Sequence, residues 1–180
     1  MSEPEITVRA AVEADAFGIA RVHVETWRDA YAGILPNDYL ADGLRLPDRT
    51  AMWARLLRGR GERDLILVAE APGEIVGFAS AGPPRGTANG FDAELYTLYV
   101  LTDFQGFGVG RALLRGVALA LGARGAKSLV TEVLRANPSR FFYEAMGGRR
   151  LAEITDRFAG QNLPAVVYGW PELAPLTAKV

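Results

Sequence analysis

The stretch from residue 94 to residue 114 constrains the fold most, because it joins a strand, a glycine turn and a helix without a break. Residues 94–101 are mostly β-branched, aromatic or leucine side chains without Gly or Pro, which is typical of a strand. Gly106, Gly108 and Gly110 follow at alternate positions, and apolar residues then recur at helical spacing. Such a unit leaves backbone N–H groups bare at the start of its helix, where anions, and phosphate above all, can bind.

The rest of the chain predicts a mixed α/β sheet in one domain, residues 5–171, followed by a flexible tail, residues 172–180. The strand–helix–strand unit around the glycine turn should link two parallel strands by a right-handed crossover. Pro72-Gly73-Glu74 instead predicts an antiparallel hairpin. The expected strands are 6–11, 65–71, 75–81, 94–101, 128–134, 149–156 and 164–170, and the expected helices are 15–32, 47–58, 109–122 and 138–146.

Composition excludes several classes of function. The 180 residues carry a net charge of −1 without a basic cluster, so we expect no nucleic-acid partner. No long apolar run is present and the first residues are acidic and polar, so we expect no membrane span or signal peptide and a cytoplasmic location. The sequence has no cysteine and a single histidine, His23, which argues against a metal site and a cysteine nucleophile. Chemistry must then rely on carboxylates, tyrosine, hydroxyls or backbone dipoles.

Two common phosphate motifs do not fit the glycine turn. A P-loop needs Lys followed by Ser or Thr after its last glycine, and Arg111 stands there. A dinucleotide fingerprint needs a third glycine at position 111 or 113, and neither is glycine. The turn alone therefore leaves anion binding and tight helix–strand packing both open.

The residues around the turn resemble the GNAT superfamily of acyl-CoA-dependent N-acyltransferases. Residues 105–112, Gln-Gly-Phe-Gly-Val-Gly-Arg-Ala, match the Gln/Arg-x-x-Gly-x-Gly/Ala pattern of that family. Asn137 and the later run Phe-Tyr-Glu-x-x-Gly at 142–147 are similar to its next helix. The resemblance covers about residues 6–170 in element order. One departure is Gly148, which stands where the family usually has Phe.

The resemblance implies a fold with two splayed central parallel strands, flanking helices and a C-terminal strand pair. It further implies acetyl-CoA as co-substrate, with its pyrophosphate on the turn and its pantetheine arm on the exposed strand edge. The N–H of Val100 would then polarise the thioester carbonyl. The coenzyme-binding residues implied in this way are Leu98, Tyr99, Val100, Gln105, Gly106, Phe107, Gly108, Val109, Gly110, Arg111, Asn137 and Tyr143.

Two residues are candidates for proton transfer. Glu94 lies six positions before Val100 on the same strand face, and its spacing matches a general-base glutamate of some family branches. It could equally be a solvated strand end or a charge that orients the substrate. Tyr143 resembles the tyrosine that the family uses as general acid towards the departing thiolate, although the run Phe-Phe-Tyr could be plain core. Asn137 before Pro138 could serve as a helix N-cap, as a coenzyme ligand, or as both.

His23, Trp27 and Tyr31 follow one another at helical spacing and could line an acceptor pocket or belong to the core. The predicted function is transfer of an acetyl group from acetyl-CoA to a primary amine of a small molecule or peptide. The alternative is a non-catalytic acyl-CoA-binding sensor or partner module on the same fold. A free sheet edge or the last two strands could also pair across a homodimer.

Overall fold

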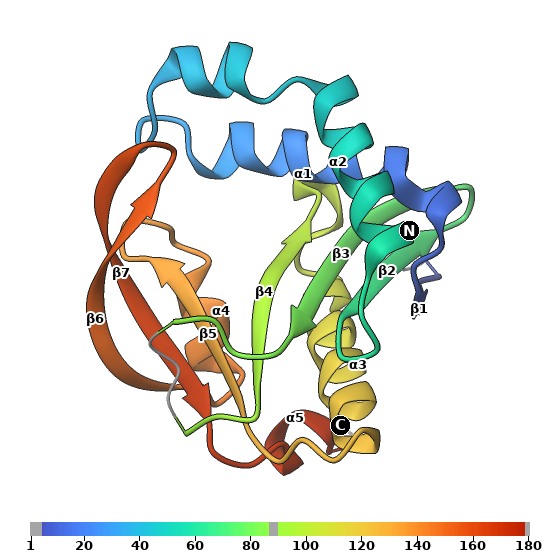
Figure 1. The fold of residues 1–180 in the computed structure, drawn as a ribbon, viewed down its shortest axis with the longest axis vertical. Helices are drawn as coiled ribbons and strands as arrows, with labels where there is room; N and C mark the ends of the chain where they lie inside the picture. Colours follow the sequence, from blue (N-terminus) through green and yellow to red (C-terminus); the bar gives the residue numbers. More distant parts are fainter. Residues whose placement is uncertain (1–4, 87–89, 179–180) are drawn as a thin grey trace.

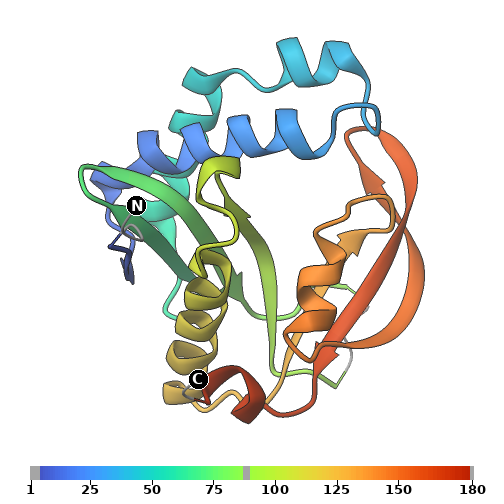
Figure 2. The same cartoon turned by 180° about the vertical axis from the view of Figure 1, so that it is seen from behind.

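A computed structural model describes residues 5–86 and 90–178, and it shows the expected mixed α/β architecture with helices on both faces of one sheet (Figures 1 and 2). The seven strands follow the order β1-β2-β3-β4-β5-β7-β6. They are β1 (Thr7–Ala10), β2 (Leu65–Ala71), β3 (Glu74–Gly82), β4 (Ala93–Val100), β5 (Leu129–Leu134), β6 (Arg149–Phe158) and β7 (Gln161–Trp170). The helices are α1 (Ala16–Ala30), α2 (Leu46–Gly59), α3 (Val109–Ala123), α4 (Arg140–Ala145) and α5 (Ala174–Thr177).

The sheet is antiparallel except at its centre, where β4 and β5 run parallel. This confirms the expected pair of central parallel strands, which α3 connects. The β2–β3 hairpin also forms at the predicted Pro72-Gly73 turn, where Gly73 has a φ of 88°. A parallel pair needs a long crossover connection, which here contains α3. The glycine turn opens this connection and therefore lies at the C-terminal end of the central strand β4.

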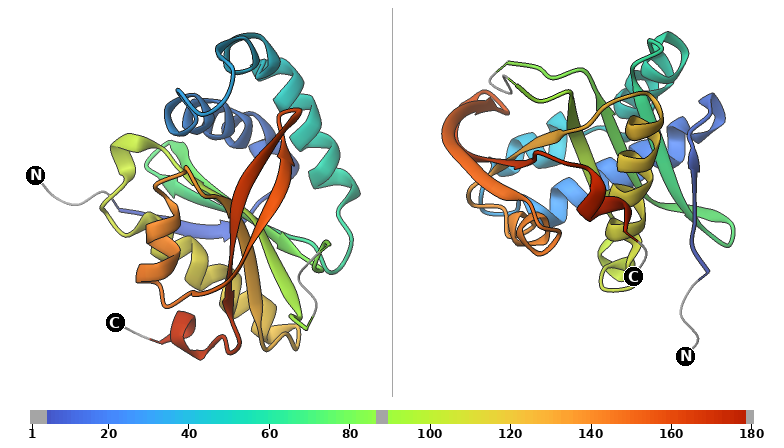
Figure 3. Two further views of the ribbon diagram at one scale, coloured as in Figure 1. Left: turned by 90° about the vertical axis from the view of Figure 1, so that its left-hand side faces the viewer. Right: turned by 90° about the horizontal axis from the view of Figure 1, so that it is seen from below.

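Helices α1 and α2 cover one face of the sheet, and α3 covers the other (Figure 3). On the first face, Phe78 of β3 packs edge-on against Trp53 of α2, with ring centroids 5.0 Å apart. On the second face, a Cβ atom at Gly77 would lie 3.2 Å from Leu113 of α3, so this glycine lets the helix approach the strand closely. The core therefore has two layers, one on each side of the sheet.

The C-terminal strand pair is longer than predicted. The sequence placed its strands at 149–156 and 164–170, with a long loop between them. In the structure β6 and β7 continue to a tight turn at Ala159 and Gly160, which both have positive φ, 49° and 78°. Alanine seldom adopts this conformation, so the local sequence gave no turn signal at that point.

The segment after Pro171 differs from the expected flexible tail. Leu173, the N-cap of α5, and Leu176 within α5 are buried, and α5 packs against α3. Arg115 of α3 donates a hydrogen bond to the carbonyl of Thr177 at 3.4 Å. Residues 172–178 are thus packed onto the domain because two leucines find apolar surface there. Residues 179–180 lie outside the described part of the chain.

Candidate active site

The central parallel strands separate part-way along their length. Pairing between β4 and β5 spans only Ala93 to Leu95 on β4, although both strands continue beyond it. At the last pair, the Thr131 hydroxyl donates a hydrogen bond to the Leu95 carbonyl at 3.0 Å. Above this point the two strands diverge towards the glycine turn (Figure 1). The split predicted by the resemblance therefore begins after Leu95.

The edge of β4 that faces the split carries backbone groups of Leu98 and Val100. Leu101 donates its N–H to the Val76 carbonyl at 2.9 Å, on the β3 side. Successive residues of a strand point their N–H and C=O groups to opposite sides, so those of Leu98 and Val100 face away from β3. The Gln105 side chain donates to the Val100 carbonyl at 3.0 Å. The split thus has one polar backbone edge, joined directly to the glycine turn.

The turn has the geometry of an anion site. Gly106 and Gly108 have φ values of 83° and 78°, and no heavy atom lies within 4 Å of the position a Cβ would take at either. Gly108 is the N-cap of α3, and its carbonyl accepts the first helical bond from Ala112. Val109 to Arg111 begin a 15-residue helix, so their N–H groups have no acceptor within the helix. The helix dipole favours negative charge at this end.

A cavity of about 430 Å³ occupies the split and extends towards α1. Its walls combine the two strand edges with side chains from α1, the β3–β4 loop, the segment after β5 and the β6–β7 hairpin. The residues of this lining that bear on the argument are Asp29, Tyr31, Arg85, Glu94, Leu98, Tyr99, Val100, Gln105, Thr131, Glu132, Asn137, Tyr143, Asp156 and Phe158.

Tyr143 lines this cavity and is 7 % exposed. Burial and the nearby hydroxyl of Tyr31 raise the pKa of Tyr143 above its usual value, against a hydrogen bond with Thr131 that lowers it. The phenol is therefore protonated at neutral pH. Asn137 is buried, and its side-chain Nδ2 donates to the Tyr31 hydroxyl at 3.4 Å while its side-chain Oδ1 accepts the N–H of Ser139 at 2.9 Å. Asn137 thus caps a turn just ahead of α4 and also faces the cavity.

Glu94 lines the cavity but is not free. Only 4 % of it is exposed, and both carboxylate oxygens accept hydrogen bonds from Arg85. Six residues of extended strand separate Glu94 from Val100, which corresponds to roughly 20 Å. Leu98, four residues away, lies roughly 13 Å from Glu94 along the strand. The pairing of β4 with β3 shifts register between Leu95 and Thr97, so this irregularity interrupts the alternation of side chains and Glu94 does not share a strand face with Val100 as predicted. Along the strand, Glu94 lies closer to Leu98 than to Val100.

Of the three aromatic residues proposed for the acceptor pocket, only Tyr31 is part of the cavity lining. Trp27 packs behind it, stacked on Phe158 with ring centroids 4.8 Å apart. His23 is buried in the core, where the Trp53 indole donates to its Nδ1 at 3.1 Å. Burial and the charge of Arg49 lower the pKa of His23 to about 4, so the ring is neutral at pH 7. His23 and Trp27 therefore match the alternative that the sequence left open, in which they belong to the core.

Among the cavity residues that the sequence analysis missed, Arg85, Phe158 and Glu132 are the most informative. Arg85 follows two prolines in a loop, and nothing local connects it to Glu94. Phe158 reaches the cavity only because the β6–β7 hairpin extends further than predicted. Glu132 did leave a signal, because it is the one charged residue of the mostly apolar strand β5.

Among residues 5–86 and 90–178, no three His, Cys, Asp or Glu side chains are grouped so that they could hold a metal ion. No helix in this part of the chain is long and apolar enough to cross a membrane.

Comparisons with known proteins identify the family to which this chain belongs. A family model described as the acetyltransferase (GNAT) family matches residues 24–147. The uncharacterized N-acetyltransferase YuaI of Bacillus subtilis is 39% identical over 171 residues, which cover 95% of this chain and 96% of that protein.

Two solved structures share the fold. A GCN5-related N-acetyltransferase from Rhodopseudomonas palustris has a TM-score of 0.71 at 25% identity, covering 94% of this chain and 96% of its own. YncA from Salmonella typhimurium, solved with acetyl-CoA, has a TM-score of 0.63 at 25% identity, covering 93% and 94%. With its central split, its glycine turn and these relatives, the chain belongs to the GNAT family of acetyltransferases.

Proposed function

We propose that this protein transfers an acetyl group from acetyl-CoA to a primary amine of a small molecule or peptide. The observation that carries the proposal is the split between β4 and β5, which opens a polar strand edge beside the glycine turn. An extended, hydrogen-bonding arm ending in a pyrophosphate matches these two features. The acetyl-CoA complex of YncA supports the same choice of co-substrate.

The coenzyme would use both parts of the site. Its pyrophosphate would accept hydrogen bonds from the backbone N–H groups of residues 106–111 at the start of α3. Its pantetheine arm would enter from the turn and pair with the free edge of β4, first at Val100 and then at Leu98, with Asn137 on the opposite wall. The thioester ends the arm, so its carbonyl would lie deeper than Val100. We therefore assign the oxyanion-stabilising N–H to Leu98 in place of Val100, which also brings the reacting carbon nearer to Glu94.

The chemical step is a direct attack. The amine nitrogen forms a bond to the thioester carbonyl carbon, and the carbon–sulfur bond breaks. The proton that the amine loses passes to Glu94, directly or through water, and the thiolate takes a proton from Tyr143. The products are the N-acetylated amine and free coenzyme A. No acyl-enzyme is needed, and the sequence contains no cysteine to carry one.

The test is a thiol-release assay with acetyl-CoA over a panel of simple amines, polyamines, aminoglycoside antibiotics and peptides. The proposal predicts that at least one primary amine accelerates release and appears as its N-acetyl product by mass spectrometry. The alternative, a non-catalytic acyl-CoA-binding module, predicts that acetyl-CoA binds while no amine accelerates release. That second result would overturn the catalytic assignment.

A further inference from the structure

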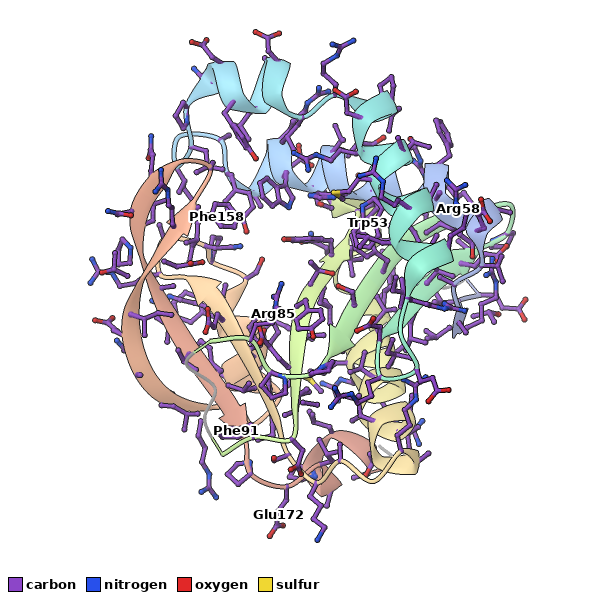
Figure 4. All side chains as sticks on the ribbon, viewed as in Figure 1. Trp53, Arg58, Arg85, Phe91, Phe158 and Glu172 are labelled. Atoms are coloured by element: carbon purple, nitrogen blue, oxygen red, sulfur yellow. The ribbon has the colours of Figure 1, made fainter. Side chains whose placement is uncertain are left out.

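Arg85 is the one cationic side chain among the described residues that line the cavity, whereas Asp29, Glu94, Glu132 and Asp156 bring carboxylates to it. Arg85 comes from the loop between β3 and β4, and Figure 4 shows it beside β4, near the centre of the molecule. An acidic cavity favours a positively charged acceptor. The protein's own guanidinium therefore lies where such an acceptor would be drawn.

Arg85 engages Glu94 with both its backbone and its side chain. The backbone N–H donates to Oε2 at 2.5 Å, and Nη2 and Nε donate to Oε1 at 3.0 and 3.3 Å. The Glu94 side chain is 5 % exposed and that of Arg85 is 64 % exposed. The carboxylate is thus part of the cavity wall, while the guanidinium covers it from the solvent side.

The guanidinium also lies over an aromatic ring. Its central carbon is 3.8 Å from the ring centroid of Tyr96. The Tyr96 hydroxyl donates to the Pro83 carbonyl, which fixes the ring beneath the loop. A carboxylate next to the face of a tyrosine is a recognised combination for binding ammonium and guanidinium groups. Glu94 and Tyr96 therefore form a cation subsite, and Arg85 fills it.

We propose that the Arg85 side chain is an internal competitor of the acceptor, and that the acceptor's cationic group displaces it from Glu94 and Tyr96. This inference rests on the proposed function for its kinetic consequences. It adds that the acceptor carries an ammonium or guanidinium group that takes the place of the Arg85 guanidinium. It also adds that Glu94 is masked until the acceptor arrives.

Displacement is feasible because the two contacts of Arg85 differ in kind. The backbone N–H keeps Oε2 in place whatever the side chain does, so Glu94 stays oriented when the guanidinium leaves. The guanidinium is 64 % exposed, so it can move into solvent without any repacking of the core. A masked site lowers apparent affinity by the fraction of molecules that are unmasked.

The first test is Arg85→Ala. It removes the guanidinium but leaves the backbone N–H, so the KM for the amine should fall about three- to tenfold. Arg85→Lys keeps a cation near Glu94 and should lie between Arg85→Ala and the wild type. Arg58→Ala is the matched control, because Arg58 of α2 is equally exposed and pairs with Glu13, just ahead of α1 and away from the cavity (Figure 4).

A supporting role for Arg85 predicts the opposite kinetic change. If Arg85 held Glu94 in its working position, Arg85→Ala would lower kcat or raise the KM for the amine. Either outcome would overturn the displacement proposal. Thermal unfolding of both alanine variants would show whether a kinetic change only reflects loss of folding.

The second test needs no acceptor. Ethylguanidinium, a free copy of the end of the arginine side chain, is titrated into each variant and followed by NMR. Arg85→Ala should bind it at millimolar concentration, whereas the wild type and the double variant Arg85→Ala/Glu94→Gln should not. Equal binding to all three, or none to Arg85→Ala, contradicts a cation subsite. Failure of every amine in the thiol-release assay would instead count against the proposed function. The ethylguanidinium titration would still test the cation subsite, because it does not depend on turnover.

Discussion

At the scale of single residues, the protonation of Tyr143 is the feature most relevant to catalysis. Its hydroxyl is buried in the cavity beside Thr131 and Tyr31, and its pKa is raised mainly by burial. A protonated phenol can donate a hydrogen bond as charge develops on the departing sulfur. Because its pKa is above that of a typical thiol, the hydroxyl stabilises the departing thiolate chiefly as a hydrogen-bond donor, and transfer of its proton is uphill and must be coupled to reprotonation of the phenol from solvent.

Tyr143→Phe removes this donor and little else. We expect kcat to fall by about tenfold or more, with the affinity for coenzyme A nearly unchanged. Tyr168→Phe is the control, because its hydroxyl bonds to Glu144 and it is not among the residues that line the cavity. Steady-state kinetics and calorimetry with coenzyme A measure the two quantities. Unchanged turnover in Tyr143→Phe would refute the general-acid role.

Glu94→Gln tests the proton acceptor in the same way. The amide is similar in size but cannot take a proton at neutral pH, so kcat should fall by roughly a hundredfold. Glu132→Gln is the informative comparison, because Glu132 is a second carboxylate on the cavity wall. Should Glu132→Gln cause the larger loss of kcat, Glu94 would be a binding residue and not the base.

At the scale of elements, the glycine turn is the part of the site that the sequence specified best. Gly106 and Gly108 both take positive φ, and α3 begins directly after Gly108. A local pattern was enough here because positive φ and a bare helix start depend on neighbouring residues alone. The parallel placement of β4 and β5 followed from the same stretch, since a crossover helix implies it.

Other features depend on contacts between distant segments and could not be predicted from the sequence. Gly148 is an example: a Cβ there would lie 2.9 Å from the Trp170 indole, so the space next to this glycine is occupied by a residue from β7. Arg85 and Phe158 likewise join the cavity through a loop and a hairpin whose paths no local pattern fixes. His23 and Trp27 show the reverse error, because helical spacing cannot distinguish a pocket wall from the core behind it.

Gly108→Val tests the turn. Valine disfavours a φ of 78° and adds bulk beside the bare N–H groups, so coenzyme A should bind at least about tenfold more weakly. Gly125→Val is a matched control at the other end of α3, with a φ of 92° and equally open surroundings. It should carry a similar strain without loss of coenzyme affinity. Equal effects of both variants on coenzyme binding would contradict a phosphate-binding turn.

At the scale of the whole molecule, the buried neutral His23 links stability to pH. Its pKa is about 4 in the folded chain and near 6.5 when exposed, so the unfolded chain binds the extra proton between these values. The stability due to neutral burial is complete above pH 6.5 and is lost as the pH falls towards 4. From pH 7 to about pH 5 the free energy of unfolding should drop by about 2 kcal/mol through this residue alone.

Urea denaturation at several pH values measures this loss. His23→Asn removes the titrating group while its side-chain carbonyl can still accept the Trp53 indole N–H. The variant should lose less stability on acidification than the wild type, whatever its stability at neutral pH. An identical pH dependence in both proteins would show that His23 is not the group responsible.

The central claim for the whole molecule is that the amine attacks acetyl-CoA directly while both occupy the split between β4 and β5. The most direct measurement is the initial rate with acetyl-CoA and an active amine both varied. Direct attack in a ternary complex predicts double-reciprocal lines that intersect, because both substrates must be bound before either product leaves. Parallel lines, together with an acetylated protein intermediate detected by mass spectrometry, would contradict this account.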